Sequence, residues 1–125
     1  VAEGGLAVAL AECCLGGGLG ARVSLGEELF GAEPADATGR EAGGSGISPD
    51  SAVALFGEGS GGFVVSGSED ALRALATSVP VRILGSVGGD ALRIECPARA
   101  GGASSISLTL AELVKAHGAL AELFA

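Results

Sequence analysis

The sequence lacks tryptophan, tyrosine and methionine altogether, and phenylalanine occurs only four times in 125 residues. Proteins that bind single-stranded nucleic acid stack bases on aromatic side chains, and this chain has almost none to offer. Cations are also scarce, since seven lysine and arginine residues stand against 15 carboxylates and give a formal net charge of -8. A field of that sign repels phosphate backbones and anionic lipid. The composition therefore excludes nucleic acid and membrane surfaces as expected partners.

Metal-binding and nucleophilic side chains are equally few. His117 is the only histidine, and the three cysteines, Cys13, Cys14 and Cys96, have no CxxC spacing. We therefore predict no metal ligand and no catalytic residue in this chain. An odd number of cysteines without a disulfide framework fits small buried side chains in a reducing cytoplasm. The nearly uncharged stretch before residue 21 contains glycines and Glu12 and has no basic segment before it, so it predicts neither a signal peptide nor a membrane span.

The chain has instead a hydrophobic content of 48% and 23 glycines. This composition predicts one domain with a core of small side chains and glycine-rich connections. Four apolar residues recur at the spacing of one helix face, namely Leu6, Leu10, Cys13 and Cys14. They predict a helix over residues 4–15 that ends at the glycine run 16–18. Residues 21–25 alternate like a short strand, and residues 26–48, rich in glycine and carboxylates, predict an excursion loop.

Capping residues indicate two helix starts in the middle of the chain. The triplet 48–50 predicts a helix start, because it supplies a hydroxyl cap, a proline at the first helical position and an early carboxylate. The apolar anchors of this short helix are Val53, Leu55 and Phe56. Residues 63–66 predict a buried strand, and residues 68–76 predict a second helix with its own serine cap.

The last third carries the clearest strand signals. Residues 81–87 and 91–96 predict a hairpin around the turn 88–90. Its expected inward side chains are Ile83, Val87, Leu92 and Ile94, and its expected outward ones are Arg82, Arg93 and Glu95. Residues 105–108 predict a final strand, and residues 109–112 have capping-box spacing and open a terminal helix whose inner face would be Leu110, Leu113, Val114, His117 and Phe124. This order predicts an α+β layered domain with a mixed, largely antiparallel sheet covered by helices.

Two glycine-rich places are candidate binding sites. In the loop 57–62, glycines allow close backbone approach to a phosphate or a sugar hydroxyl, although no Walker or dinucleotide-binding motif is present and a tight turn is the alternative. The candidates there are Glu58, Gly59 and Ser60. Gly4 and Gly5 offer backbone N–H groups at the start of the first helix, which suit a phosphate or another anion. Glu3 opposes an anion, and close packing of the helix start is the alternative.

Four runs resemble a known family in their order and spacing. Residues 1–12 read VAEGGLAVALAE, residues 55–66 read LFGEGSGGFVVS, and residues 81–90 read VRILGSVGGD. Near the end, residues 106–113 read ISLTLAEL. Together these runs resemble the C-terminal domain of phosphoribosylformylglycinamidine synthase, which belongs to the aminoimidazole ribonucleotide synthetase-like superfamily. The resemblance covers nearly the whole chain outside the excursion loop.

The resemblance implies an ATP-dependent carbon–nitrogen ligase of purine biosynthesis. In that family, formylglycinamide ribonucleotide, ATP and ammonia derived from glutamine give the amidine, ADP and phosphate. ATP and magnesium are the implied cofactors of the full-length enzyme, and none is assigned to this chain, because the family's catalytic histidines and magnesium carboxylates lie in separate nucleotide-binding domains. The implied partners are the remaining domains of the synthase and a glutaminase subunit or domain, in the cytoplasm.

The resemblance also defines what this chain would contribute. The family's S-E-S-Q loop contacts the ribonucleotide, and the matching residues here keep only Glu58. A W-D-L run is lacking after the terminal helix, which implies the second copy of the domain. We expect one C-terminal-type domain over residues 1–125, truncated on its N-terminal side at Val1 and inactive in isolation. The alternatives are a free-standing, non-catalytic interaction module, or the C-terminal domain of aminoimidazole ribonucleotide or selenophosphate synthetase.

Overall fold

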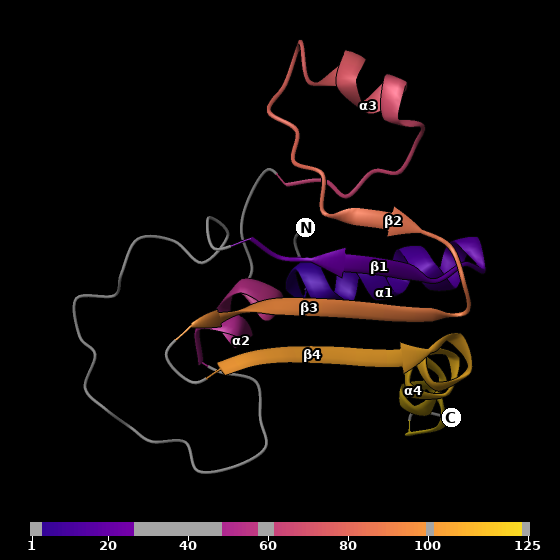
Figure 1. Ribbon diagram of the computed structural model, residues 1–125. Helices are drawn as coiled ribbons and strands as arrows, with labels where there is room; N and C mark the ends of the chain where they lie inside the picture. Colours follow the sequence, from indigo (N-terminus) through magenta and orange to yellow (C-terminus); the bar gives the residue numbers. More distant parts are fainter. Residues whose placement is uncertain (1–3, 27–48, 58–61, 100–101, 124–125) are drawn as a thin grey trace.

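The computed structural model describes residues 4–26, 49–57, 62–99 and 102–123. In chain order the elements are α1 (Gly5–Gly17), β1 (Ala21–Ser24), α2 (Pro49–Phe56), α3 (Glu69–Leu75), β2 (Gly85–Val87), β3 (Ala91–Arg99), β4 (Gly102–Thr109) and α4 (Leu110–Leu123). One sheet joins the four strands (Figure 1). The α+β class expected from the sequence is confirmed. The predicted excursion loop lies, apart from residue 26, outside the described residues.

The sheet has the strand order β2-β1-β3-β4. β1 is antiparallel to β2 and parallel to β3, and β4 is antiparallel to β3. The sheet is therefore mixed and largely antiparallel, as predicted. Its register sets Val23 beside Ile94, and Ile94 beside Ile106. Because side chains alternate between the two faces of a strand, these three project from the same face and form one apolar row.

The hairpin predicted for the last third of the chain is wrong, because β1 lies between β2 and β3. Ala21 pairs with Val87 on one side and with Leu92 on the other. Two backbone hydrogen bonds, each 2.8 Å long, tie Gly20 to the turn glycines 88–89. The turn thus carries the chain past the start of β1. A turn between two apolar runs predicts a hairpin only when no distant strand inserts between them, and local periodicity carries no information about such a strand.

The side chains predicted to face inward from this pair of strands divide between core and surface. Leu92 and Ile94 are buried, whereas Val87 is exposed and Ile83 is 61% exposed. Ile83 precedes β2, and Val87 lies in a strand with no further described strand on its outer side. The three residues predicted to face outward are exposed as expected, namely Arg82, Arg93 and Glu95. The strand paired on both sides therefore supplies the core, and the edge strand does not.

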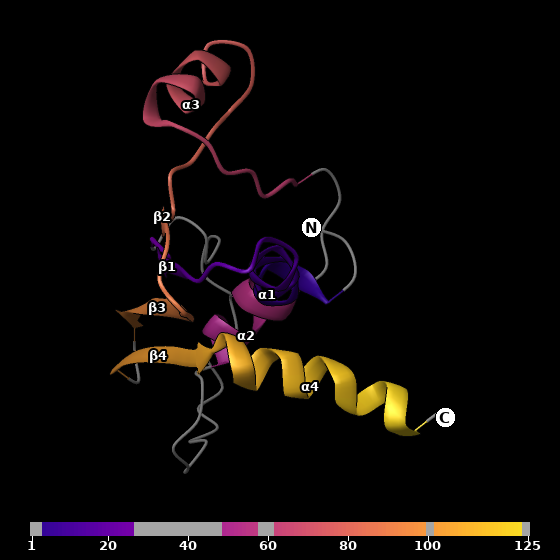
Figure 2. The same cartoon turned by 90° about the vertical axis from the view of Figure 1, so that its right-hand side faces the viewer.

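The helices α1, α2 and α4 lie on one side of the sheet, and no described helix covers the other side (Figure 2). The core fills the space between these layers and consists of Ala7, Leu10, Cys14, Ala21, Val23, Leu25, Leu55, Leu92, Ile94, Cys96 and Leu113. Leu55 and Ile94 are its largest fully buried side chains. The predicted core of small and aliphatic residues is confirmed in the described part of the chain.

α1 buries one face against the core. Its buried residues are Gly5, Ala7, Leu10 and Cys14. The helix ends where Gly18 adopts φ 65° and donates its N–H to the carbonyl of Cys14 at 2.9 Å, which is the predicted glycine cap. The helix reaches Gly17, two residues beyond the predicted end. Cys13 was expected on the apolar face but is exposed. The buried residue is Cys14, and neighbouring residues of a helix are rotated by about 100° from each other, so the two side chains do not share a face.

α2 begins at Pro49, where the cap triplet predicts a helix start. Only one of its three predicted anchors reaches the core, since Leu55 is fully buried while Val53 and Phe56 are exposed. On a helix, residues one or two positions away do not share a face. An eight-residue helix that directs Leu55 into the core therefore turns Val53 and Phe56 away from the sheet.

The segment 62–84 leaves the sheet and returns at β2 (Figure 1). The helix predicted for residues 68–76 is confirmed as α3, and the Ser68 hydroxyl accepts a hydrogen bond from the N–H of Ala71 at 3.2 Å. The buried strand predicted for residues 63–66 is wrong, because these residues form no strand and Phe63 is 88% exposed. Strand propensity reflects packing on a sheet. The run has no strand beside it in the described part of the sheet, so its β-branched residues have nothing to pair with.

A reciprocal capping box joins β4 to α4, as predicted. The Thr109 hydroxyl accepts the N–H of Glu112 at 3.2 Å, and the Glu112 carboxylate accepts the N–H of Thr109 at 2.8 Å. Of the predicted inner face, Leu113 is buried and Leu110 is half-buried, but Val114 and His117 are exposed. Phe124 lies outside the described residues. α4 extends away from the sheet, so only its first turns meet the core (Figure 2).

The capping box makes α4 sensitive to acid. Hydrogen bonds from the backbone and then the side chain of Thr109 lower the pKa of Glu112 from its ordinary value of 4.5. A carboxylate with a lowered folded-state pKa stabilises the fold above its unfolded pKa, and this stabilisation is lost as the pH falls through the folded value. Below pH 4.5 we expect the melting temperature of the wild type to fall more steeply with pH than that of Glu112→Gln.

Circular dichroism at 222 nm measures this difference directly. Glu122→Gln, a change of the same type near the end of α4, is the control and should keep the wild-type slope. At neutral pH, Glu112→Gln should melt below the wild type, because the neutral amide is a weaker acceptor for the Thr109 N–H. Parallel slopes for wild type and Glu112→Gln would contradict a role for the carboxylate in the cap.

Candidate functional site

The start of α1 is built from two glycines in left-handed conformations. Gly4 has φ 76° and Gly5 has φ 77°. A Cβ atom on Gly4 would lie 2.7 Å from the Val8 side chain. A Cβ on Gly5 would lie 2.7 Å from the carbonyl oxygen of Leu55 and 2.7 Å from the Cα of Phe56. Both positions therefore need glycine, and at Gly5 the reason is the approach of a second backbone.

This approach brings the end of α2 against the start of α1. The amino end of a helix carries a partial positive charge and the carboxyl end a partial negative one, so the two ends attract. The Leu55 carbonyl, in the last turn of α2, lies next to Gly5, on the side where a Cβ atom would project. Close packing, the alternative weighed from the sequence, is thus present at Gly5. An anion-binding role for Gly4 and Gly5 stays a prediction.

The loop predicted to bind a phosphate or sugar starts at the same place. Gly57 follows Phe56 directly, and its N–H donates to the carbonyl of Val53 at 2.8 Å, closing the last turn of α2. A Cβ on Gly57 would lie 2.3 Å from that carbonyl oxygen. The other candidates of this loop lie outside the described residues, namely Glu58, Gly59 and Ser60. The residues that contact Gly5 therefore come directly before Gly57, the first residue of the predicted loop.

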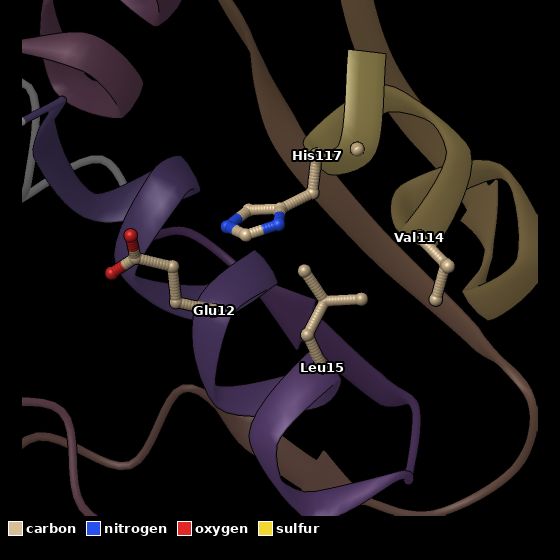
Figure 3. A pocket seen from close by; sticks show the side chains of 5 residues that line it. Glu12, Leu15, Val114 and His117 are labelled. Atoms are coloured by element: carbon tan, nitrogen blue, oxygen red, sulfur yellow. The ribbon is translucent and has the colours of Figure 1, made fainter. Parts of the chain in front are cut away.

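A groove that the sequence analysis did not identify lies between α1 and α4. It has a volume of about 560 Å³ and is lined by Glu12, Leu15, Val114, His117 and Gly118. Figure 3 shows the imidazole of His117 extending from α4 towards α1, where Glu12 and Leu15 project. The sequence did contain one indication of this groove. Glu12 and Leu15 in α1, like Val114 and His117 in α4, are three residues apart and therefore share a helix face. The groove offers one imidazole and one carboxylate over an apolar floor.

A second hollow, of about 380 Å³, lies at one end of the sheet and is lined by Ser24, Leu25, Glu95, Cys96, Pro97, Ser104 and Ser105. The hydroxyl oxygen of Ser104 is buried there without a hydrogen-bond partner. A buried polar atom of this kind is ordinarily satisfied by water or by another ligand. Among the described residues that line this hollow, the one charged side chain is the carboxylate of Glu95.

The three cysteines are free thiols, of which two are buried and one is exposed. Cys14 and Cys96 are buried as predicted, and Cys13 is exposed. Burial, and then the neighbouring Cys13, raises the pKa of the Cys14 thiol. A raised pKa keeps the thiol protonated, which makes it a poor nucleophile. Within the described ranges, no three histidine, cysteine or carboxylate side chains lie close enough to hold a metal ion, and no helix is long and apolar enough to cross a membrane.

Comparison with known proteins agrees with the resemblance read from the sequence. Residues 1–96 match the family described as "AIR synthase related protein, C-terminal domain". Phosphoribosylformylglycinamidine synthase subunit PurL of Thermobifida fusca is 39% identical over 97 residues, which are 74% of this chain and 10% of that protein. The same subunit of Brucella ovis is 30% identical over 122 residues, covering 94% of this chain and 13% of that protein.

The chain therefore spans only 10% to 13% of the length of these curated relatives. No solved structure matches it. The matched family range of residues 1–96 nevertheless contains α1, β1, α2, α3, β2 and the start of β3, and with them both candidate sites. The chain belongs to the family of AIR synthase related proteins and represents their C-terminal domain.

Proposed function

We propose that this chain is the C-terminal-type domain of an ATP-dependent phosphoribosylformylglycinamidine synthase, a ligase of purine biosynthesis. In that enzyme it would help to convert formylglycinamide ribonucleotide to the amidine with ammonia derived from glutamine. The observation that carries the proposal is the 30% identity to the PurL subunit of Brucella ovis, over 94% of this chain. The domain would extend over residues 1–125 and would work beside the remaining domains of the synthase and its glutaminase, in the cytoplasm.

In this proposal the domain binds and positions, and the chemistry takes place on other domains. The backbone at Gly4 and Gly5 and the loop residues Glu58, Gly59 and Ser60 would contact the ribonucleotide or a phosphate. The contact of Gly5 with Leu55 and Phe56, which come shortly before Glu58 in the sequence, supports a shared role for the two segments. ATP and magnesium would be held by the nucleotide-binding domains of the full-length enzyme.

A domain exchange tests the proposal. The matching segment of the Thermobifida fusca subunit, which is 39% identical to this chain, would be replaced by residues 1–125. We expect the chimera to form amidine from the ribonucleotide, ATP and ammonium at a rate within about tenfold of the parent, a change of about 1.4 kcal/mol in the barrier. The parent subunit without this segment is the negative control, and the isolated 125-residue chain should show no ATP turnover.

The outcomes separate the proposal from its alternatives. A soluble, folded chimera that is no more active than the truncated parent would count against a role in this synthase, and would favour a free-standing module or another member of the superfamily. Turnover by the isolated chain that Glu58→Ala abolishes would overturn the assignment of the chemistry to other domains.

A further inference from the structure

The face of the sheet opposite α1, α2 and α4 (Figure 2) carries one polar row across all four described strands. The register sets four residues next to one another in the order of the strands, namely Ser86, Arg22, Arg93 and Ser107. All four are exposed. Their chain neighbours Val23 and Ile94 are buried on the helix side, so the four project from the opposite face, which no described helix covers (Figure 2). We call these four residues the arginine row.

The two arginines stand side by side, and neither forms an ion pair with another described residue. Neighbouring strands lie about 4.8 Å apart, and like charges placed directly beside one another destabilise a sheet. Arg73 forms an ion pair with Glu69 in α3, whereas neither Arg22 nor Arg93 has a described carboxylate within 4.0 Å. Glu95, on the same face, pairs in register with Ser24 rather than with an arginine. Among the described residues, no direct ion pair offsets the repulsion between the two guanidinium groups.

The surroundings of the row indicate the chemistry of an occupant. Adjacent guanidinium groups bind carboxylates or phosphates through paired hydrogen bonds. Small phosphate ligands are ordinarily enclosed in a concave site, but neither of the two hollows described above includes Arg22 or Arg93. Single-stranded nucleic acid stacks its bases on aromatic side chains, and the row contains none. An acidic protein surface remains as the occupant that fits a flat, narrow row of cations.

We propose that the arginine row is a docking surface for a partner protein that presents neighbouring carboxylates. Two carboxylates pair with Arg22 and Arg93, and the hydroxyls of Ser86 and Ser107 donate hydrogen bonds at the two ends. Docking removes the repulsion between the guanidinium groups, so partner binding and sheet stability are coupled. The chain as a whole, with net charge -8, repels an acidic partner. Salt screens this long-range repulsion, whereas the contact between carboxylates and the two arginines acts at short range.

A titration of the 125-residue chain with poly-L-glutamate of about 20 residues, followed by NMR of the arginine Nε–H groups, tests the proposal at low ionic strength, where screening is weak. We expect the signals of Arg22 and Arg93 to shift together and to saturate. The double variant Arg22→Gln/Arg93→Gln should lose about tenfold or more in affinity, because both charge-assisted contacts disappear. Arg73→Gln is the matched control, since this exposed arginine is already paired with Glu69, and it should bind as the wild type does.

Three outcomes would overturn the proposal. These are the absence of shifts at the two arginines, an equal loss of affinity in Arg73→Gln, and tighter binding of tripolyphosphate than of poly-L-glutamate at the row, which would mark a phosphate site. A single variant, Arg93→Thr, keeps the test valid if the double variant folds poorly. Relief of the repulsion should raise its melting temperature by about 2 °C while its affinity for poly-L-glutamate falls. A fall in melting temperature would instead make the row a structural feature.

Discussion

Replacing Gly5 by alanine is expected to destabilise the chain by about 2–5 kcal/mol, as two separate penalties add. A left-handed conformation at a residue with a side chain costs about 1–2 kcal/mol. The new Cβ would also lie 2.7 Å from both the Leu55 carbonyl oxygen and the Phe56 Cα, and α2 must move to relieve this overlap. Overpacking of this kind costs about 1–3 kcal/mol. The contact between the start of α1 and the end of α2 would be lost together with the stability.

Chemical denaturation followed by circular dichroism measures the effect. Gly118→Ala in α4 is the matched control, because a Cβ at that position meets nothing within 4 Å. It should stabilise the chain by about 0.5–1 kcal/mol, since alanine restricts the unfolded chain and favours helix. If Gly5→Ala were as stable as the wild type, α2 would not lie against the start of α1 as described.

Ile94→Ala is expected to cost about 2–5 kcal/mol, the range found when a large aliphatic side chain is removed from a packed core. Ile94 is 1% exposed and lies in β3, paired in register with Val23 on one side and Ile106 on the other. Its removal leaves a cavity under the centre of the sheet. The cost depends on how far the surrounding leucine and valine side chains can move into that cavity.

The same substitution at Ile83 gives a direct comparison. Ile83 was predicted to face inward together with Ile94, yet it is 61% exposed. Ile83→Ala should therefore change the free energy of unfolding by no more than about 0.5 kcal/mol, as for an ordinary surface position. Urea denaturation midpoints of the two variants give the result. Losses of equal size would contradict the placement of Ile83 outside the core.

Features that depend on nearby residues could be predicted from the sequence. The Thr109–Glu112 capping box, the Ser68 cap of α3 and the glycine cap of α1 each formed where their spacing indicated. Their hydrogen bonds join residues three or four positions apart, so the chemistry of each cap is contained in its own segment. The α+β class and the small-residue core followed from composition and from the order of helical and extended segments. The family resemblance was readable for a similar reason, because its runs are contiguous in sequence.

The position of the candidate site shows where this reasoning stops. Glycines at residues 4 and 5 indicated an accessible helix start, whereas Gly5 carries the contact with Leu55 and Phe56. No property of residues 4 and 5 specifies that the end of α2, some fifty residues later, lies beside them. The groove between α1 and α4 was missed in the same way, since its lining comes from both ends of the chain.

The sequence by itself determined the helices, their caps, the class of fold and the membership of the family. Tertiary structure alone decided that β1 separates β2 from β3, that residues 63–66 stay outside the sheet and that Arg22 lies beside Arg93. The physical reason is that a helix satisfies its backbone within one segment, while a strand must find its partner elsewhere in the chain. Alternation shows which residues can share a face of a strand. It cannot show which distant strand supplies the neighbour, and that choice made both the core and the arginine row.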